Sequence, residues 1–331
     1  MRSVVAVGLV VGFLVGCGAQ ASPTPSAGPT SLTVGLGYIE SVQFAQFYRA
    51  SQQGYYHDAG LDVTFQHQID SQLVPQIGLG TVDIGLSDGT SLIPAVSQGI
   101  PVRYAATIYA QFPSVVLAKT ASGIAAPADL RGKRLGIPGR YGSSWIMLQA
   151  LLASAGLVPD DLDIRLYAEF GQATGLREGQ VEAATGFANN EPVQLALAGI
   201  ETNVLRIDEI TPLPGPGLVV GASTLSSKAE AIRAFVAATL RAMREIIANP
   251  EVGMVDAIAE VPDLGIDRSV QLAILQATVA MWQSPYTDQH GLGAIDADAW
   301  SSSIQFMQTL PDAGVSDGLT ADQLLTEDYL P

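Results

Sequence analysis

Short apolar runs alternate with helical patterns along the first two thirds of the chain. Residues 32–36 form an apolar, β-branched run, and the stretch after it places Phe44, Phe47 and Tyr48 on one side of a helix. Residues 62–65 form the next apolar run. A strand, a helix and a second strand in this order are typical of a parallel sheet, so we predict an α/β fold. Further runs predict strands at the end of residues 78–86 and within residues 103–108, 114–118, 135–137, 162–167, 203–207 and 218–222.

The last third of the chain has a helical pattern. Apolar residues within 232–247 recur on one face of a long helix, which Asn249 and Pro250 end. The residues from Ser227 to Glu230 have the sequence of a capping box, so this helix is expected to start there. Two more helices are predicted within residues 270–282 and 300–309. We expect these helices to serve packing rather than chemistry.

Polar and aromatic residues follow the predicted strands, at the sheet edge where open α/β folds bind ligands. They combine ring surfaces with neutral hydrogen-bonding groups and little positive charge, which suits a flat, uncharged heteroaromatic ligand. Aromatic faces can stack on such a ring, and amide and carboxylate groups can read an edge with one N–H between two carbonyls. The candidate ligand-binding residues are Tyr38, Gln43, Phe44, Asp88, Tyr109, Gln111, Arg140, Tyr141, Ser143, Trp145, Phe187, Asn190 and Glu191.

Several of these residues have a structural role as the alternative. Asp88 could cap the helix that follows it, and Phe44 could belong to the core. Glu191 could be the acid in the first turn of a helix, and Arg140 could lie at the surface. An anionic ligand would need a cation and convergent amide donors, so Arg140 and the helix start at Ser143 are the features to examine for that case.

Composition narrows the function classes. The formal net charge of −16 argues against binding to nucleic acid or to an acidic membrane surface. The three histidines, His57, His67 and His290, do not have the spacing of a zinc site, and no Gly-x-Ser-x-Gly sequence is present. We therefore expect a binding protein rather than an enzyme, with no metal and no cofactor.

The N-terminal residues have the pattern of a bacterial export signal. Arg2 precedes an apolar run over residues 4–16, which is too short to cross a bilayer because a spanning helix needs about 20 residues. The tetrapeptide LVGC that ends at Cys17 resembles the lipoprotein box, which implies cleavage before Cys17 and lipidation of that residue. We predict a signal peptide over residues 1–16 and a flexible tether over residues 17–30. Cys17 is the only cysteine, so the chain can form no internal disulfide.

Four motifs resemble a family of solute-binding proteins that serve ABC importers. Residues 54–63 fit GYYxxxGLDV, residues 80–102 fit GxxDIGxxxxxxLxxAxxxGxPV, and residues 129–139 fit DLxGKxxGxxG. Residues 176–184 are similar to LxxGxVDAA, with Glu in place of Asp. The members bind thiamine pyrimidine precursors or aliphatic sulfonates. The resemblance covers about residues 31–225 and implies a type II periplasmic-binding-protein fold, in which two lobes close over a ligand by a hinge.

The resemblance also implies the division of the chain. We expect lobe 1 to comprise residues 31–116 and 217–331, and lobe 2 to comprise residues 117–216. The two crossing segments are expected near residues 115–120 and 212–218.

The stretch GYIESVQFAQFY, residues 37–48, resembles the riboflavin-binding branch of this family most closely. It implies a lipoprotein that is anchored through Cys17 at the extracytoplasmic face of the cell membrane, captures riboflavin and hands it to the permease and ATPase of an ABC importer. Three alternatives remain open: a thiamine pyrimidine precursor as the ligand, an aliphatic sulfonate such as taurine as the ligand, or a surface lipoprotein that senses its ligand. The broader family includes a eukaryotic pyrimidine synthase, whose intracellular chemistry does not fit an exported lipoprotein.

Overall fold

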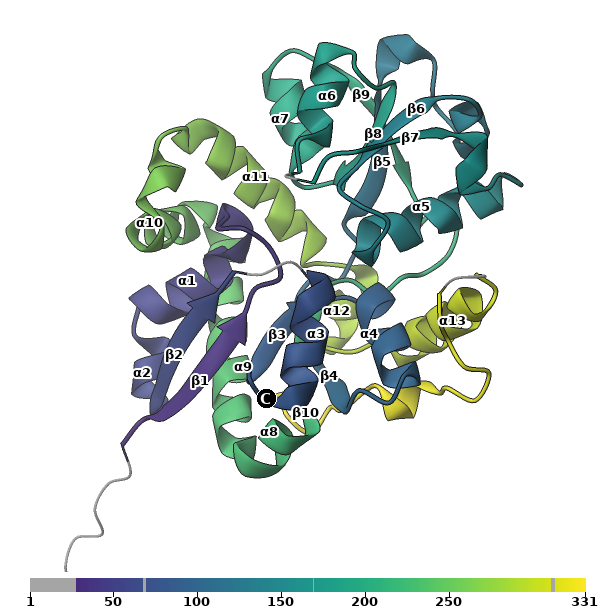
Figure 1. Cartoon of the computed structure of the whole chain (residues 1–331). Coiled ribbons are helices and arrows are strands. Elements are labelled where there is room, and N and C mark those ends of the chain that lie inside the picture. Colours follow the sequence, from purple (N-terminus) through teal and green to yellow (C-terminus); the bar gives the residue numbers. More distant parts are fainter. Residues whose placement is uncertain (1–27, 68–69, 169, 311–312) are drawn as a thin grey trace, which may run out of the picture.

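Two five-stranded sheets form the centres of two lobes, and the chain passes between them twice (Figure 1). The computed structural model describes residues 28–67, 70–168, 170–310 and 313–331. We call the part built on the first sheet the first lobe, and the part built on the second sheet the second lobe. This architecture confirms the predicted α/β fold with two lobes. The predicted signal peptide, Cys17 and residues 17–27 of the predicted tether lie outside the described residues.

Each sheet contains one strand that runs against its neighbours. In the first sheet, β10 is antiparallel to β3 and β4, and in the second sheet β5 is antiparallel to β8 and β9. The first sheet has the order β2 (Leu61–Gln66), β1 (Thr30–Gly35), β3 (Ile84–Ser87), β10 (Gly217–Gly221) and β4 (Val102–Thr107). The second has the order β7 (Asp163–Leu166), β6 (Arg134–Ile137), β8 (Ala183–Phe187), β5 (Ser114–Lys119) and β9 (Thr202–Arg206).

Helices cover both faces of each sheet, which is why β3 and β10 are buried along their whole length. Among the described residues, no helix is both long and apolar enough to cross a membrane. The helices are the single 3₁₀ turn η1 (Val42–Phe44), α1 (Ala45–Gln52), α2 (Tyr55–Asp58), α3 (Asp70–Leu79), α4 (Gly89–Ser97), α5 (Gly142–Ser154), α6 (Gln172–Glu178), α7 (Glu191–Leu197), α8 (Ala222–Ser227), α9 (Ala229–Ala248), α10 (Pro250–Glu260), α11 (Arg268–Met281), α12 (Pro285–His290) and α13 (Ala297–Gln308), besides short 3₁₀ turns in the loops.

The two crossing segments lie against each other between the lobes. Residues 108–113 connect β4 to β5, and residues 207–216 connect β9 to β10. The first crossing comes earlier than expected, because β5 already pairs within the second sheet. A Cβ added at Gly215 would lie 2.3 Å from the carbonyl oxygen of Tyr109, so only glycine allows this approach. The exact lobe boundaries remain a prediction.

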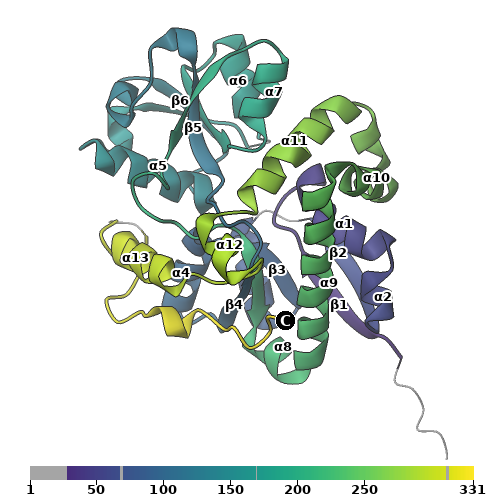
Figure 2. The ribbon, with the colours of Figure 1, turned by 180° about the vertical axis from the view of Figure 1, so that it is seen from behind.

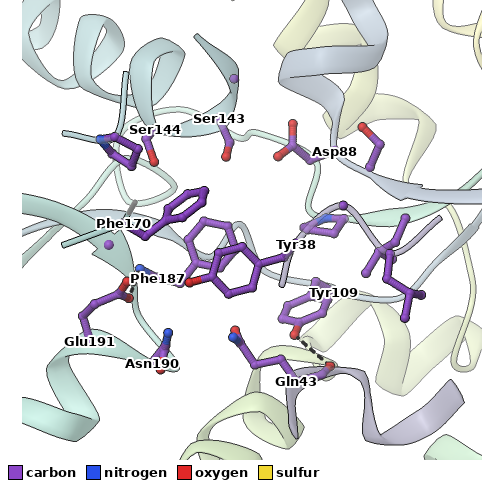
Figure 3. A pocket seen from close by; sticks show the side chains of 18 of the residues that line it. Tyr38, Gln43, Asp88, Tyr109, Ser143, Ser144, Phe170, Phe187, Asn190 and Glu191 are labelled. Atoms are coloured by element: carbon purple, nitrogen blue, oxygen red, sulfur yellow. Dashed lines mark hydrogen bonds between the residues drawn. The ribbon is translucent and has the colours of Figure 1, made fainter. Parts of the chain in front are cut away.

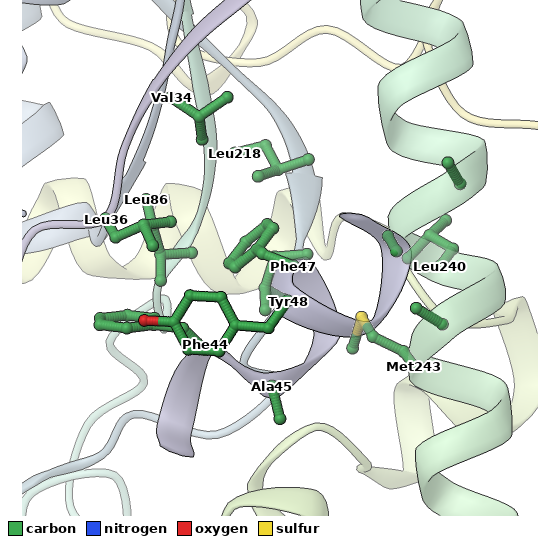
Figure 4. Close-up of a cluster of buried hydrophobic side chains, with 14 of the residues drawn as sticks. Val34, Leu36, Phe44, Ala45, Phe47, Tyr48, Leu86, Leu218, Leu240 and Met243 are labelled. Carbon is green, nitrogen blue, oxygen red and sulfur yellow. The ribbon is translucent and has the colours of Figure 1, made fainter. Parts of the chain in front are cut away.

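A cluster of aromatic and aliphatic side chains fixes α1 between the first sheet and α9 (Figure 4). Phe47 and Tyr48 of α1 are fully buried, and the ring of Phe47 stacks on Phe235 of α9 at a centroid distance of 6.2 Å. Burying one such side chain stabilises the fold by about 1.5–3 kcal/mol. The cluster therefore gives a rigid base to η1 and to the turn before it, which carry residues of the site.

The long C-terminal helix does not begin as the sequence indicates. Ser227 is the last residue of α8, and its hydroxyl donates to the carbonyl oxygen of Ser223 at 2.8 Å. It is therefore not used as a cap, and α9 starts at Ala229 without a side-chain cap at Lys228. The predicted capping box is wrong because the local hydrogen bond within α8 takes the hydroxyl.

Helix α11 bridges the two lobes at one side of the molecule (Figure 2). It follows the last strand of the first sheet in the chain, packs against η1 of the first lobe and also contacts α7 of the second lobe. Behind the crossing segments, the Ser303 hydroxyl of α13 donates to the carbonyl oxygen of Pro212 at 2.5 Å. The C-terminal helices thus do more than cover the first sheet.

Candidate functional site

A pocket lies between the lobes, at the ends of strands from both sheets (Figure 3). Hydroxyl and carboxylate groups line one side, aromatic rings that include Tyr38, Phe170 and Phe187 cross the middle, and amide groups with Glu191 line the other side. None of the described residues that line it is Lys, Arg or His. The described residues contain no group of three or more His, Cys, Asp or Glu side chains that could hold a metal. The pocket is lined by Leu36, Gly37, Tyr38, Gln43, Phe44, Leu86, Ser87, Asp88, Tyr109, Pro138, Tyr141, Gly142, Ser143, Ser144, Phe170, Gln172, Gly186, Phe187, Asn190, Glu191 and Pro216.

The first-lobe wall, which comprises Tyr38, Gln43, Phe44, Asp88 and Tyr109, is held by hydrogen bonds within the protein. Asp88 is buried and caps α4, since its Oδ1 accepts from Thr90 N at 2.9 Å and from Thr90 Oγ1 at 2.6 Å. The amide of Gln43 donates to Ser41 Oγ at 3.1 Å. Burial raises the pKa of the Tyr109 hydroxyl, which therefore stays protonated.

Aromatic rings from both lobes meet in the middle of the pocket. The ring of Tyr38 meets the ring of Phe170 edge to face, with centroids 5.0 Å apart. Tyr38 follows β1 of the first lobe, whereas Phe170 and Phe187 belong to the second lobe. Because these two rings already touch, a flat molecule can stack against a free face of either ring, or can lie between them after they separate.

Phe170 is held in an unusual backbone conformation. Its φ of 58° makes it the only non-glycine residue with positive φ among the described residues. A side chain in this region costs about 1–2 kcal/mol, and such strain persists where the surrounding structure imposes it. Here it directs an aromatic ring into the pocket.

Glu191 places a carboxylate at the pocket without a cation to pair with it among the described residues. Its Oε2 accepts from the backbone N–H of Phe187 at 2.7 Å. Burial raises the pKa of Glu191, and this hydrogen bond lowers it only in part. A Cβ at Gly186 would lie 3.0 Å from the carboxylate, so glycine makes room for it. The group is suited to accept a hydrogen bond from a ligand N–H or O–H.

Gln172 offers a second acceptor on the same lobe. The side chain is 2 % exposed, and its Oε1 has no hydrogen-bond partner among the described residues. A buried acceptor without a partner costs about 1–3 kcal/mol unless water or a ligand donates to it. Because Gln172 also lines the pocket, a ligand can supply that donor.

The start of α5 contributes donors from the opposite side. Ser143 and Ser144 are in its first turn, where backbone N–H groups have no partner within the helix. Figure 3 shows their hydroxyls on the same side of the pocket as Asp88. The sequence placed the helix start at Ser143, whereas the helix begins at Gly142 with Tyr141 as its N-cap.

Ten of the thirteen predicted residues line this pocket, and three lie elsewhere. Gln111 lies in the first crossing segment and donates to the carbonyl oxygens of Ala280 and Gln283 at 3.1 and 3.0 Å, outside this pocket. Arg140 is exposed and its guanidinium lies 5.3 Å from the ring centre of Trp145. Trp145 packs where the cores of the two lobes meet. Residues that line the pocket are Tyr38, Gln43, Phe44, Asp88, Tyr109, Tyr141, Ser143, Phe187, Asn190 and Glu191.

Helix geometry explains why Trp145 is turned away. Successive residues of an α-helix are about 100° apart, so a residue two positions after Ser143 lies nearly opposite to it. Phe170 and Gln172 were missed by sequence reasoning. Both follow a predicted strand, and this position, which indicated the other candidates, could also have indicated these two.

Known proteins with similar sequences or folds support one family. The NMT1/THI5-like family model matches residues 41–252. The riboflavin-binding protein RibY of Chloroflexus aurantiacus is 32% identical over 98% of this chain and 96% of its own. A 4-amino-5-hydroxymethyl-2-methylpyrimidine phosphate synthase of Legionella pneumophila is 28% identical over 61% of this chain and 65% of its own.

Solved structures show the fold. The alkanesulfonate-binding protein SsuA of Xanthomonas axonopodis pv. citri, bound to MOPS, superposes with a TM-score of 0.68 at 17% identity and covers 91% of this chain and all of its own. A Candida albicans protein with the generic periplasmic binding protein fold has a TM-score of 0.63 at 18% identity, with 90% and 96% of the two chains covered. The protein therefore has the periplasmic-binding-protein fold and belongs to the NMT1/THI5-like family.

Proposed function

We propose that this protein is an extracytoplasmic solute-binding protein that captures riboflavin and delivers it to an ABC importer. The observation that carries the proposal is the pocket between the lobes, where aromatic rings from both lobes meet among neutral and acidic hydrogen-bonding groups. No cation lines its walls in the part of the chain that the structure describes. Riboflavin has a flat, neutral ring system and a polyol chain, and this lining complements both.

The hydrogen-bonding groups match the parts of riboflavin in kind. The pyrimidinedione edge has one N–H between two carbonyls, and Glu191 and Gln172 are acceptors that a ring N–H can use. Ser143, Ser144 and Asp88 lie together on the other side of the rings, where hydroxyl groups of the polyol could bind. The similarity to RibY over nearly the whole chain supports the same ligand.

Charge argues against the anionic alternatives. A sulfonate or the phosphate of FMN needs convergent donors and usually a cation. The pocket offers the amides at the start of α5, but it also contains the carboxylates of Asp88 and Glu191, and Arg140 lies outside its lining. We therefore expect riboflavin to bind better than FMN and much better than taurine.

The remaining parts of the proposal concern location and partners. We propose that the chain is held at the extracytoplasmic face of the cell membrane by lipidated Cys17 and passes its ligand to a permease with an ATPase subunit. A surface sensor that signals without import is the alternative. Loss of riboflavin uptake when the gene is deleted in the source organism would distinguish import from sensing.

Fluorescence titration tests the ligand. The purified protein is titrated into riboflavin, and quenching of flavin emission is expected at micromolar concentration or below, together with a higher melting temperature. Taurine and a thiamine pyrimidine precursor serve as controls. Absence of quenching and of thermal stabilisation by riboflavin would overturn the ligand, and stabilisation by a control compound would identify the alternative.

A further inference from the structure

Three buried polar side chains from different parts of the chain meet behind the pocket. Gln43 belongs to η1, Asn189 to the turn after β8, and Thr278 to α11. They are 4%, 1% and 0% exposed. Asn189 belongs to the second lobe, whereas Gln43 and Thr278 are on elements that pack with the first lobe. Only Gln43 lines the pocket.

The hydrogen bonds between them diverge from Asn189, which donates to both of its neighbours. The Thr278 hydroxyl donates its single hydrogen to the carbonyl oxygen of Ile274 at 2.8 Å, so its oxygen can only accept from Asn189. Asn189 Nδ2 donates both to Thr278 Oγ1 and to Gln43 Oε1, each at 2.8 Å. We call this series, from Ile274 through Thr278 and Asn189 to Gln43, the amide relay.

The relay determines which atom Gln43 presents to the pocket. Because Oε1 of Gln43 faces Asn189, its Nε2 points the other way and donates to Ser41 Oγ at 3.1 Å. Nε2 carries a second hydrogen, which Gln43 can offer to a ligand in the pocket that it lines. We infer that Asn189 and Thr278, which do not line the pocket themselves, are positioning residues that fix Gln43 as a donor and so select ligands with an acceptor at that place.

A reversed relay is the specific competitor. In it, Thr278 and Gln43 would both donate to Asn189, and Gln43 would present its carbonyl oxygen to the pocket. If only Gln43 turned over, its N–H groups would face those of Asn189, and two buried donors would share no acceptor. In the present orientation, Asn189 Oδ1 has no hydrogen-bond partner among the described residues. No contact of Oδ1 therefore fixes the orientation of the Asn189 amide.

The relay also depends on the position of the lobes. Asn189 reaches Gln43 and Thr278 only because the second lobe lies against the first at this point. Opening the hinge withdraws Asn189 and leaves the Gln43 amide free to rotate. The donor is therefore set when the lobes close. This inference rests on the proposed function because it needs a ligand in this pocket, but it does not need that ligand to be riboflavin.

Binding measurements with three variants test the relay. Asn189→Asp replaces the donor by acceptors, so the Gln43 amide must turn over, and riboflavin affinity is expected to fall about tenfold or more. Thr278→Val removes the acceptor for Asn189 and is expected to lower the affinity several-fold. The matched control Thr278→Ser keeps the hydroxyl and should bind within about twofold of the wild type. Thermal melts identify any variant that has failed to fold. If Asn189→Asp fails, Thr278→Val still tests the relay, because valine retains the shape of the threonine side chain.

The outcomes separate the relay from the choice of ligand. Folded Asn189→Asp and Thr278→Val variants that bind riboflavin as well as the wild type would overturn the relay. If the wild type does not bind riboflavin, the proposed ligand fails and neutron diffraction of the deuterium-exchanged wild-type protein decides instead. Deuterium on the Asn189 atom that faces Thr278 and Gln43 is expected, and deuterium on the Gln43 atom that faces Asn189 would overturn the inference.

Discussion

The two walls of the pocket differ in how completely their polar groups are satisfied. On the first lobe, Asp88 caps a helix and Gln43 is bonded at both ends of its amide. On the second lobe, and within the part of the chain that the structure describes, Gln172 has a buried acceptor without a partner and Glu191 carries a carboxylate with no cation beside it. Phe170 on that lobe is also held at positive φ. Asp88 and Gln43 of the first-lobe wall are bonded within the protein, with one Gln43 N–H left for a ligand. The second-lobe wall is built for groups that a ligand must bring.

This difference indicates how binding and closure are coupled. Unsatisfied buried groups destabilise the free protein by about 1–3 kcal/mol each, and a ligand that satisfies them stabilises the bound state by a similar amount. Substitutions on the second lobe should therefore reduce binding while leaving stability unchanged or higher. Substitutions on the first lobe should reduce stability as well.

Glu191→Gln is the change with the largest expected effect. It keeps an oxygen for the Phe187 N–H but removes the charge, and a hydrogen bond to a charged group contributes about 1.5–3 kcal/mol. Riboflavin affinity should fall about 10–100-fold in a fluorescence titration. The free energy of unfolding in urea should not fall. A large loss of stability would show that Glu191 is a structural group and would contradict the comparison.

The pH dependence of binding provides a second test of Glu191. Burial raises the pKa of Glu191 in the folded protein, so the charged form is disfavoured there. The contribution of Glu191 to stability therefore increases as the pH falls through the raised pKa. Binding that uses the carboxylate should weaken over the same range, beginning above the pH at which an ordinary glutamate titrates, about 4.3. The Glu191→Gln variant should lack this step. A wild-type affinity that is independent of pH in this range would exclude the carboxylate as the acceptor.

Phe170 can be tested by a matched pair of substitutions. Phe170→Ala and Phe170→Gly both remove the ring, so both should lower riboflavin affinity by about tenfold through lost stacking. Glycine also relieves the positive φ, so the Gly variant should be more stable than the Ala variant by about 1 kcal/mol. Denaturant unfolding measures this difference. Equal stability of the two variants would mean that the backbone at Phe170 is not strained.

The fold could be predicted from the sequence because its signals are local. Apolar runs indicated the strands, and the ends of parallel strands indicated where Tyr38, Asp88 and Phe187 would gather. The predicted family and α/β fold with two lobes are confirmed. The first crossing was misplaced by a few residues because a strand looks alike in either sheet.

The parts that could not be predicted depend on side-chain direction and on the tertiary structure. Trp145 is aromatic and close to Ser143 in sequence, but the turn of the helix directs it away from the pocket, where it packs partly buried against the cores of both lobes. Phe170 reaches the pocket through a backbone conformation that its residue type does not favour. The partnerless oxygen of Gln172 is a property of its surroundings, and no sequence pattern reports it.

Asp88→Ala tests the completeness of the first-lobe wall. Loss of an N-cap typically costs about 0.5–2 kcal/mol, and here Thr90 would also lose its partner. The free energy of unfolding should therefore fall by about 1–2 kcal/mol. Asp88→Asn is the control because asparagine caps a helix nearly as well as aspartate, so its stability should stay close to that of the wild type. If the Ala variant were as stable as the wild type and only binding changed, Asp88 would belong with the unsatisfied groups of the second lobe.

Gln172→Leu is the mildest change and the most specific to the second lobe. It replaces a buried amide by an apolar group of similar size, so the free protein should lose no stability and is expected to gain up to about 1 kcal/mol. If a riboflavin N–H donates to Gln172, the affinity should fall only about 2–10-fold, as expected for a neutral hydrogen bond. Thermal melts with and without riboflavin measure both quantities on one sample. A Leu variant that is less stable than the wild type without ligand would mean that water already satisfies the Gln172 amide in the free protein. The contrast between the two walls would then be smaller than the side-chain contacts alone indicate.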